Sequence, residues 1–263
     1  MNVVGFLLLS LAVSLIVDPV VGQQVTLIES PAGTSSGQPH LDRGVDGIVR
    51  MCWVETDERS ARLRFSALGV EGWSAPRTIA EGDRWFVNWA DVPSLAADAH
   101  GNLLAHWLER LGDGSYAYGV RMRISTDGGA TWGAPFWIHD DRSAQEHGFC
   151  SILPKAKVGQ IQDITPGFWV VWLDGRDMPE TDEMTLRART VGIDGKLGRE
   201  AVLDPRVCEC CPTAIARGGD GLPLMTYRDR SGKDVRDIAV ARHGLFGWGK
   251  PAILHDDRWT RPG

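Results

Sequence analysis

The sequence predicts an all-β fold in which four-stranded antiparallel units repeat along the chain. Short apolar segments alternate with Gly-containing turns through most of the 263 residues. The composition, with 31 Gly and 11 Trp against 3 Tyr, suits many short strands joined by tight turns. Two sequence elements also recur at a regular spacing. A chain of this length can form one large all-β domain.

Residues 1–22 differ from the rest and are typical of a secretory signal peptide. Val3 to Val17 is a nearly unbroken apolar run of about fifteen residues, which is short for a membrane span. Val20-Val21-Gly22 then supplies the small residues that precede a cleavage site, although no Lys or Arg precedes the run. We therefore expect a secreted or periplasmic protein whose folded domain is residues 23–263, with an uncleaved anchor as the alternative.

The first recurring element is W-x-x-P followed by an acidic-basic pair. Its copies are Trp73–Pro76 with Asp83-Arg84, Trp132–Pro135 with Asp141-Arg142, and Trp248–Pro251 with Asp257-Arg258. Asp204-Pro205-Arg206 holds the corresponding place in the unit that lacks the Trp. Each copy indicates the last strand of a unit and the loop that follows it.

The second recurring element is an apolar strand that ends in charge. Its copies are residues 51–55, 104–110, 169–176 and 224–230. The two elements together define units at roughly 38–80, 90–140, 147–203 and 211–256, each with four strands. Units of this kind cannot bury both faces alone, so they stack around an axis as the blades of a β-propeller.

The segment Ser125–Trp132 has the pattern S-x-D-x-G-x-x-W and lies between two predicted strands, Tyr118 to Ile124 and Ala134 to His139. The Asp127 carboxylate can accept hydrogen bonds from nearby backbone N–H groups, and Gly129 can supply a positive φ. Trp132 can fold back over the turn. The pattern therefore predicts a hairpin turn.

With this Asp-box motif (BNR repeat) the chain resembles the sialidase-like family of β-propellers, in which such boxes recur from blade to blade. The resemblance implies a structural role for Ser125, Asp127, Gly129 and Trp132, on the rim opposite the active face. Propellers of this family have six blades, whereas this chain stops at Gly263, where the next inner strand would begin. We therefore expect about four blades and a propeller that is incomplete at its C-terminus.

Strand alternation brings two sets of loops to one face: those between successive blades and those between the second and third strands of each blade. These loops carry Trp, Arg and carboxylates, which can stack on sugars, pair with a substrate carboxylate and protonate a glycosidic oxygen. The candidate catalytic residues are Asp83, Asp141 and Glu146. The candidate substrate-binding residues are Arg84, Trp85, Arg142, Arg176, Asp177, Arg228, Arg230 and Arg258.

Two observations weaken the enzymatic interpretation. Sialidases hold the substrate carboxylate with three Arg and use a Tyr–Glu pair as nucleophile and an Asp as acid/base, but the usual F/Y-R-I-P segment is missing here. Tyr116 and Tyr118 are expected in a peripheral strand and Tyr227 in a blade interior. The repeated acidic-basic pairs are also explained as ion pairs between blades, which makes the non-repeated Glu146, Arg176 and Asp177 better functional candidates.

Five Cys are present, and three of them fall within Cys208-Glu209-Cys210-Cys211. We expect disulfides, either a bridge between Cys210 and Cys211 or a bridge from one of the three to Cys150. An odd count leaves at least one thiol without a partner in this chain. Ligation of a soft metal, with His147 nearby, is the weaker alternative, and we predict neither a cofactor nor a resident metal.

The sequence therefore predicts an exported sialidase-like glycoside hydrolase that acts on a glycan or glycoconjugate at the axial face of the propeller. The alternative is a non-catalytic propeller that binds glycan or protein and carries a structural Cys cluster. The formal net charge of −6 gives no reason to expect nucleic acid as a partner. We also expect no stable membrane insertion after the signal peptide is cleaved.

Overall fold

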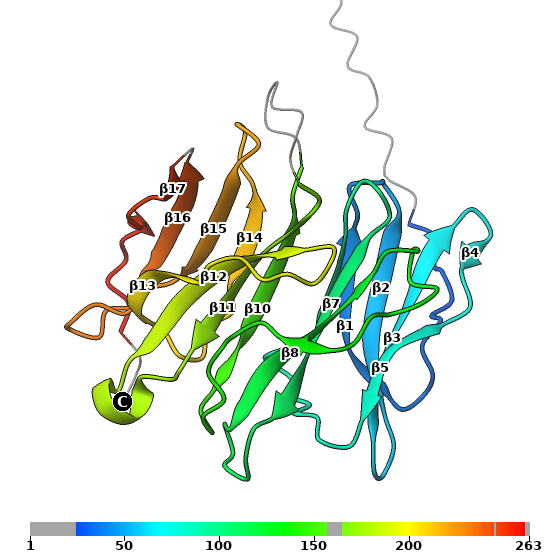
Figure 1. The fold of residues 1–263 in the computed structure, drawn as a ribbon, viewed down its shortest axis with the longest axis horizontal. Helices are drawn as coiled ribbons and strands as arrows, with labels where there is room; N and C mark the ends of the chain where they lie inside the picture. The colour runs from blue at the N-terminus through cyan, green and yellow to red at the C-terminus, as the bar shows by residue number, and fades with distance from the viewer. Residues whose placement is uncertain (1–24, 157–164, 245, 261–263) are drawn as a thin grey trace, which may run out of the picture.

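A computed structural model describes residues 25–156, 165–244 and 246–260, and the predicted signal peptide lies outside these residues. The described chain is all-β, as predicted, and forms four antiparallel sheets with a single short helix. Figure 1 shows the sheets side by side, with the N-terminal sheet in blue and cyan and the C-terminal sheet in orange and red.

Each sheet is one blade, and its first three strands are neighbours in sequence order; in blades one and four the last two short strands both pair with the third. Blade one holds β1 (Ser36–Arg43), β2 (Val49–Thr56), β3 (Ala61–Gly69), β4 (Gly72–Trp73) and β5 (Arg77–Gly82). Blade two holds β6 (Ser94–Ala97), β7 (Leu103–Arg110), β8 (Tyr118–Ser125) and β9 (Phe136–Trp137). Blade three holds β10 (His147–Pro154), β11 (Gly167–Asp174), α1 (Met178–Thr181), β12 (Met184–Gly192) and β13 (Ala201–Val207). Blade four holds β14 (Ala214–Arg217), β15 (Pro223–Arg228), β16 (Ile238–Gly244), β17 (Gly247–Trp248) and β18 (Ala252–His255).

The first strands of the blades are the inner strands of the molecule. β6 contacts both β1 and β10, and β10 contacts β14, so the inner strands lie next to one another in chain order. The blades therefore fan around a shared axis, which is the propeller arrangement that the repeats predicted.

Apolar side chains between neighbouring blades form the core. Alternating residues of β2 and β3, such as Cys52 and Phe65, pack against Leu103 and Ala105 of blade two. Equivalent clusters join blade two to blade three and blade three to blade four. Trp53, Trp107 and Trp172 are 1%, 4% and 0% exposed, consistent with their expected role in blade packing.

The Ser125–Trp132 segment forms the predicted turn between β8 and β9. Ser125 Oγ accepts a hydrogen bond from the Gly129 N–H at 2.8 Å, and the Asp127 carboxylate accepts one from the Thr131 N–H at 2.9 Å. Hydrogen bonds from the Thr131 side chain and backbone lower the pKa of Asp127 to about 2. Trp132 packs edge-on against Phe65 of blade one, with ring centroids 5.9 Å apart. The turn thus fastens blade two to blade one.

A recurring ion pair lies inside the blades. An acidic residue at the end of the second strand faces an Arg of the third strand, and the pairs are Glu55–Arg64 at 3.3 Å, Glu109–Arg121 at 3.3 Å and Asp174–Arg187 at 3.8 Å. The acidic-basic dipeptides behave differently. Asp141 lies beside His147, Arg142 lies over the Trp137 ring, and Arg258 lies beside Asp256. The dipeptides therefore form no recurring ion pair between blades in the described segments.

No helix among the described residues is both long and apolar enough to cross a membrane.

Candidate functional site

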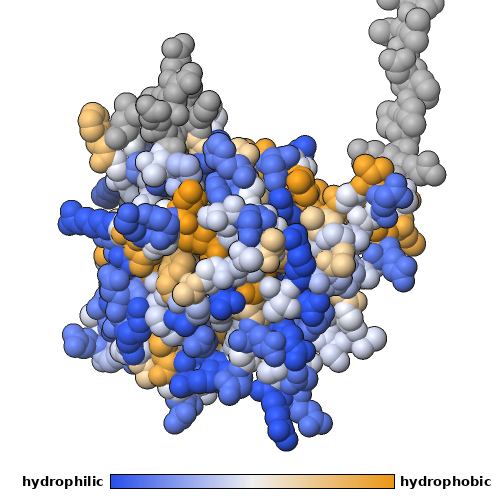
Figure 2. Space-filling model, turned by 45° about the vertical axis from the view of Figure 1, so that its right-hand side comes forward, coloured by the Kyte–Doolittle hydropathy of each residue, from blue (hydrophilic) through white to orange (hydrophobic). Residues whose placement is uncertain are grey.

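Two sets of loops meet at one end of the molecule, which we call the axial face. It carries the interblade loops 83–93, 138–146 and 208–213 and the loops 111–117, 175–183 and 229–237 between second and third strands. This end lies at the bottom of Figure 1, where α1 is seen, and its surface is mostly hydrophilic in Figure 2. The turn at Ser125–Trp132 joins the third and fourth strands and lies at the opposite end.

A cavity of about 350 Å³ lies along the inner strands. All four inner strands contribute to its walls: His40 and Asp42 from β1, Ser94 from β6, Ser151 from β10 and Ala214 from β14. Asp91, which precedes β6, also lines it. The four blades therefore meet around one hollow with polar groups in its wall.

Asp91 is the centre of a buried acidic cluster beside this cavity. Its Oδ2 accepts a hydrogen bond of 2.7 Å from the Phe149 N–H and lies 3.5 Å from the Tyr118 hydroxyl. The same hydroxyl donates a 2.6 Å hydrogen bond to Glu146 Oε1. Gly148 permits this approach, because a Cβ at that position would overlap Asp91 Oδ2.

The cluster shifts the proton affinity of both carboxyl groups. Burial raises the pKa of Asp91 to about 7, and the negative charge of Glu146 adds to the shift. Burial also raises the pKa of Glu146. A carboxyl group with a pKa near neutrality can act as a proton donor.

Tyr118 lies in the third strand of blade two, a peripheral strand as predicted, but its side chain contacts the acidic cluster. It opens β8, and its side chain reaches the inner end of the blade, where Phe86 stacks on the ring with centroids 4.0 Å apart. Tyr118 is only 1% exposed, and burial raises the pKa of its hydroxyl well above the usual value. Its geometry suits holding Glu146 better than attacking a substrate.

His147, next in sequence to Glu146, joins two further carboxylates. Its Nε2 lies 3.0 Å from Asp141 Oδ2 and its Nδ1 lies 3.1 Å from Asp174 Oδ2. The ring stacks on His139 with centroids 4.0 Å apart. Burial, with the neighbouring His147, lowers the pKa of His139 to about 3, so His139 is neutral.

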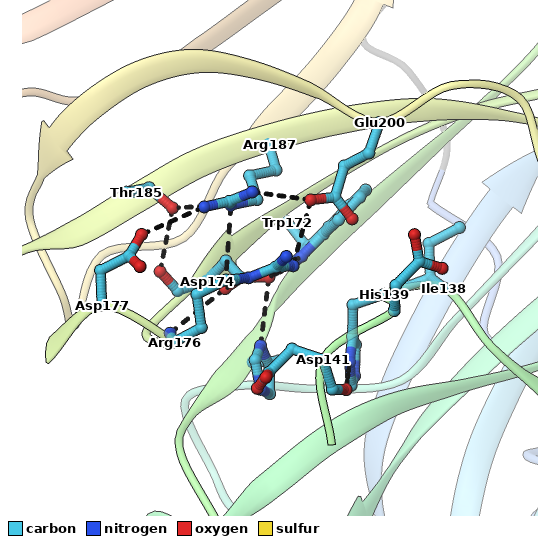
Figure 3. Close-up of polar contacts among 12 residues, drawn as sticks. Ile138, His139, Asp141, Trp172, Asp174, Arg176, Asp177, Thr185, Arg187 and Glu200 are labelled. Atoms are coloured by element: carbon cyan, nitrogen blue, oxygen red, sulfur yellow. Dashed lines mark hydrogen bonds and ion pairs between the residues drawn. The ribbon is translucent and has the colours of Figure 1, made fainter. Parts of the chain in front are cut away.

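Asp174 and two arginines extend the network across blade three (Figure 3). Arg176 donates hydrogen bonds to both oxygens of Asp174, at 2.7 and 2.6 Å, and lies 3.1 Å from Glu200. Arg187 donates to Glu200 at 2.7 Å and to Asp177 at 3.1 Å. Burial alone would raise the pKa of Asp174, yet the Arg176 hydrogen bonds hold it well below the ordinary value.

The structure separates the predicted site residues into three groups. Asp141, Arg142, Glu146, Arg176 and Asp177 lie around His147 at the junction of blades two and three. Asp83, Arg84 and Trp85 line a separate hollow of about 250 Å³ between blades one and two, where Trp85 stacks on Trp107.

The third group belongs to blade four and the chain that follows it. Arg228 lies over the Trp259 ring, 4.9 Å from its centroid, and Arg230 is paired with Asp234 at 2.9 Å. Arg258 is exposed. Among the described residues, no ion pair and no shared cavity joins these arginines to Arg84 or Arg142.

Sequence analysis missed Asp91, His139 and Glu200 as members of the site. A signal was available for Asp91, because it stands just before an inner strand as Glu146 does. No local pattern singles out Glu200, which reaches the network only because β13 lies beside β12.

The cysteines pair differently from both expectations. Cys208 and Cys211 form a disulfide, whereas Cys150 is free and buried and Cys210 is free and exposed. The loop 208–211 turns back on itself, which brings positions three residues apart together with a Cα–Cα distance of 5.7 Å.

No protein-family model and no curated protein matches this chain. Among solved structures, the Hadza microbial sialidase Hz136 matches with a TM-score of 0.50 at 15% identity, over 84% of this chain and 47% of that one. A xylan β-1,4-xylosidase from Bacillus halodurans matches with a TM-score of 0.48 at 16% identity, over 87% and 44%. An endo-arabinase from Bacteroides thetaiotaomicron matches with a TM-score of 0.47 at 16% identity, over 84% and 81%. This chain thus spans about half the length of the sialidase. The fold that the two proteins share is a sialidase-like β-propeller.

Proposed function

We propose that the protein hydrolyses a glycosidic bond at the axial face, with Asp91 as the proton donor. The observation that carries the proposal is a buried carboxyl group with a pKa of about 7 in the wall of a cavity formed by all four inner strands. The negative charge of Glu146 helps to raise the pKa of Asp91, and the Tyr118 hydroxyl holds Glu146 in place, so both are positioning residues in this scheme.

The second carboxylate of the proposed site is Asp141. Burial opposes ionisation of Asp141, yet hydrogen bonds from Ser143 and the neighbouring His147 lower its pKa. One carboxyl group on this face thus retains its proton while another stays ionised, the division of roles that acid-base hydrolysis requires. Asp83 remains a candidate for the same chemistry at the hollow between blades one and two.

We propose an acidic glycan as the substrate. Arg142 is exposed beside Asp141, and an arginine can pair with a substrate carboxylate through two parallel hydrogen bonds. The sialidase with a similar fold acts, by its name, on substrates of this kind. We also propose export, because a disulfide such as Cys208–Cys211 persists in an oxidising compartment.

The test is turnover of a panel of sialosides and uronic acid glycosides by purified protein. We expect Asp91→Asn to lower kcat by about 100-fold or more with little change in KM, since a general acid contributes 10²–10⁴-fold. Activity of the wild type should fall as the pH rises through about 7, because Asp91 then loses its proton. Asp194→Asn, in a turn at the opposite end of the molecule, is the matched control and should leave kcat unchanged.

A second candidate function is glycan binding without turnover. The observation that favours it is the low exposure of the acidic cluster, since Asp91 is only 3% exposed. Binding on a glycan array by a protein that turns over nothing in the panel selects this function and rules out the hydrolase. Full activity of Asp91→Asn would leave hydrolysis standing but remove Asp91 as its acid.

A further inference from the structure

Three cysteine sulfurs lie together in the loop 208–213 of the axial face. Cys208, Cys210 and Cys211 each offer a sulfur, and the three atoms lie within 4.8 Å of one another. Among the described residues, no other set of three His, Cys, Asp or Glu side chains brings its ligand atoms so close. The proposed hydrolysis uses none of these cysteines.

The spacing of two of the sulfurs suits a metal ion. Thiolates that bind Zn²⁺ lie about 2.3 Å from it, so two of them in a tetrahedral site are about 3.8 Å apart. The Sγ atoms of Cys208 and Cys210 are 3.9 Å apart. Cys210 is exposed, so an ion can reach it from solvent, whereas Cys208 is buried at the base of the loop.

A buried arginine faces the innermost sulfur. Arg236 is 1% exposed, and its Nη1 lies 3.4 Å from Cys208 Sγ and 2.8 Å from Glu209 Oε2. A disulfide sulfur is a weak acceptor, but a thiolate gains from a fixed positive charge at this distance. Arg236 therefore places an N–H donor beside the Cys208 sulfur, where it can hydrogen-bond to a metal-bound thiolate.

We propose that the reduced loop binds a thiophilic cation, Zn²⁺ or Cu⁺, through Cys208, Cys210 and Cys211. In the oxidised protein two of the three sulfurs are joined in the Cys208–Cys211 disulfide and cannot bind the cation as thiolates. Two equivalents of a small thiol reduce that bond and leave as one disulfide, which generates the two cysteine thiols. Binding the cation then displaces their protons and that of Cys210. The site is thus open only under reducing conditions, and soft thiolate ligands select these metals.

The experiment titrates Cd²⁺, as a spectroscopic substitute for Zn²⁺, into the full chain after reduction with dithiothreitol and its anaerobic removal. We expect one tightly bound Cd²⁺ per chain, with an ultraviolet thiolate-to-metal charge-transfer band. The oxidised protein should bind none. Calorimetry with Zn²⁺ should give the same stoichiometry.

Cys210→Ser tests the site without touching the disulfide, since Cys210 is exposed and free. It should weaken Cd²⁺ binding about tenfold or more and reduce the band to about two thirds, because one of three thiolate ligands is lost. Cys52→Ala removes a buried thiol of blade one and should bind as the wild type does. Equal binding by wild type and Cys210→Ser, or binding by the oxidised protein, would overturn the proposal. These readouts do not depend on glycoside turnover.

Discussion

At the scale of single residues, Asp91 and Asp141 show how one face gives two carboxyl groups opposite properties. Asp91 is 3% exposed and has a negatively charged neighbour in Glu146, so its pKa rises to about 7. The Asp141 side chain is 23% exposed; burial alone would raise its pKa, but a hydrogen bond from Ser143 and the neighbouring His147 lower it. The sequence places both residues in interblade loops, and only their surroundings distinguish them.

The raised pKa of Asp91 predicts a pH-dependent stability. Its ordinary value is 3.8, so between about pH 4 and pH 7 the folded state holds a proton that the unfolded state has released. The free energy of unfolding should therefore fall as the pH rises through this window, by on the order of 3 kcal/mol from this residue. Urea unfolding at pH 4 and pH 8 measures the effect.

Asp91→Asn isolates this contribution because an amide stays neutral. The variant should match the wild type at pH 4 more closely than at pH 8, where it should be the more stable of the two. If the difference between the two proteins is the same at both pH values, the pKa of Asp91 is not raised in the folded state.

At the scale of the element, the turn between β8 and β9 carries two adjacent glycines that differ in their surroundings. Gly128 and Gly129 have φ values of +68° and +83°, which strain any other residue. A Cβ at Gly128 meets nothing within 4 Å, whereas a Cβ at Gly129 would overlap the Phe65 ring of blade one. Gly129 is therefore needed both for the backbone and for the contact between blades.

We expect Gly129→Ala to lower the free energy of unfolding by about 2–4 kcal/mol, the sum of backbone strain and overpacking. Gly128→Ala is the matched control and should cost about 1–2 kcal/mol, from strain alone. Thermal or urea unfolding of both variants measures the difference. If both variants lose the same free energy of unfolding, the contact of Gly129 with the Phe65 ring does not contribute to stability.

The turn also shows which features the sequence could predict. The Asp127 carboxylate accepts a hydrogen bond from the Thr131 N–H four residues further on, so a local motif was sufficient to predict this bond. The Tyr118–Glu146 pair joins residues 28 positions apart. Its partners meet only because the start of β8 lies against the loop that precedes β10, a register that no local pattern specifies.

The cysteines illustrate the same limit at shorter range. The residues were correctly recognised as a cluster, but the Cys208–Cys211 pairing depends on how the loop turns between its two ends. By contrast, the repeats predicted the fold because each blade repeats one hydrophobic pattern that only a neighbouring blade can cover.

At the scale of the whole molecule, arginines of third strands hold neighbouring blades together. Arg123 of blade two donates a 2.9 Å hydrogen bond to the Ile79 carbonyl of blade one. Arg189 of blade three donates one of 2.7 Å to the Ile138 carbonyl after blade two and lies 3.1 Å from Asp140. Each arginine thus binds the last strand of the preceding blade or the residue after it. These contacts couple blades whose described strands belong to separate sheets.

This coupling predicts the effect of Arg189→Met, which keeps a long apolar stem but removes the donor. The Ile138 carbonyl then loses a buried partner, so the free energy of unfolding should fall by about 1–3 kcal/mol. Arg242→Met is the matched control: Arg242 is 57% exposed and pairs with Asp220 within blade four, so its loss should cost about 0–1 kcal/mol. Urea unfolding of the two variants decides the point. If they lose equal stability, the contact between blades two and three rests on apolar packing, and the arginine adds nothing to the cohesion of the propeller.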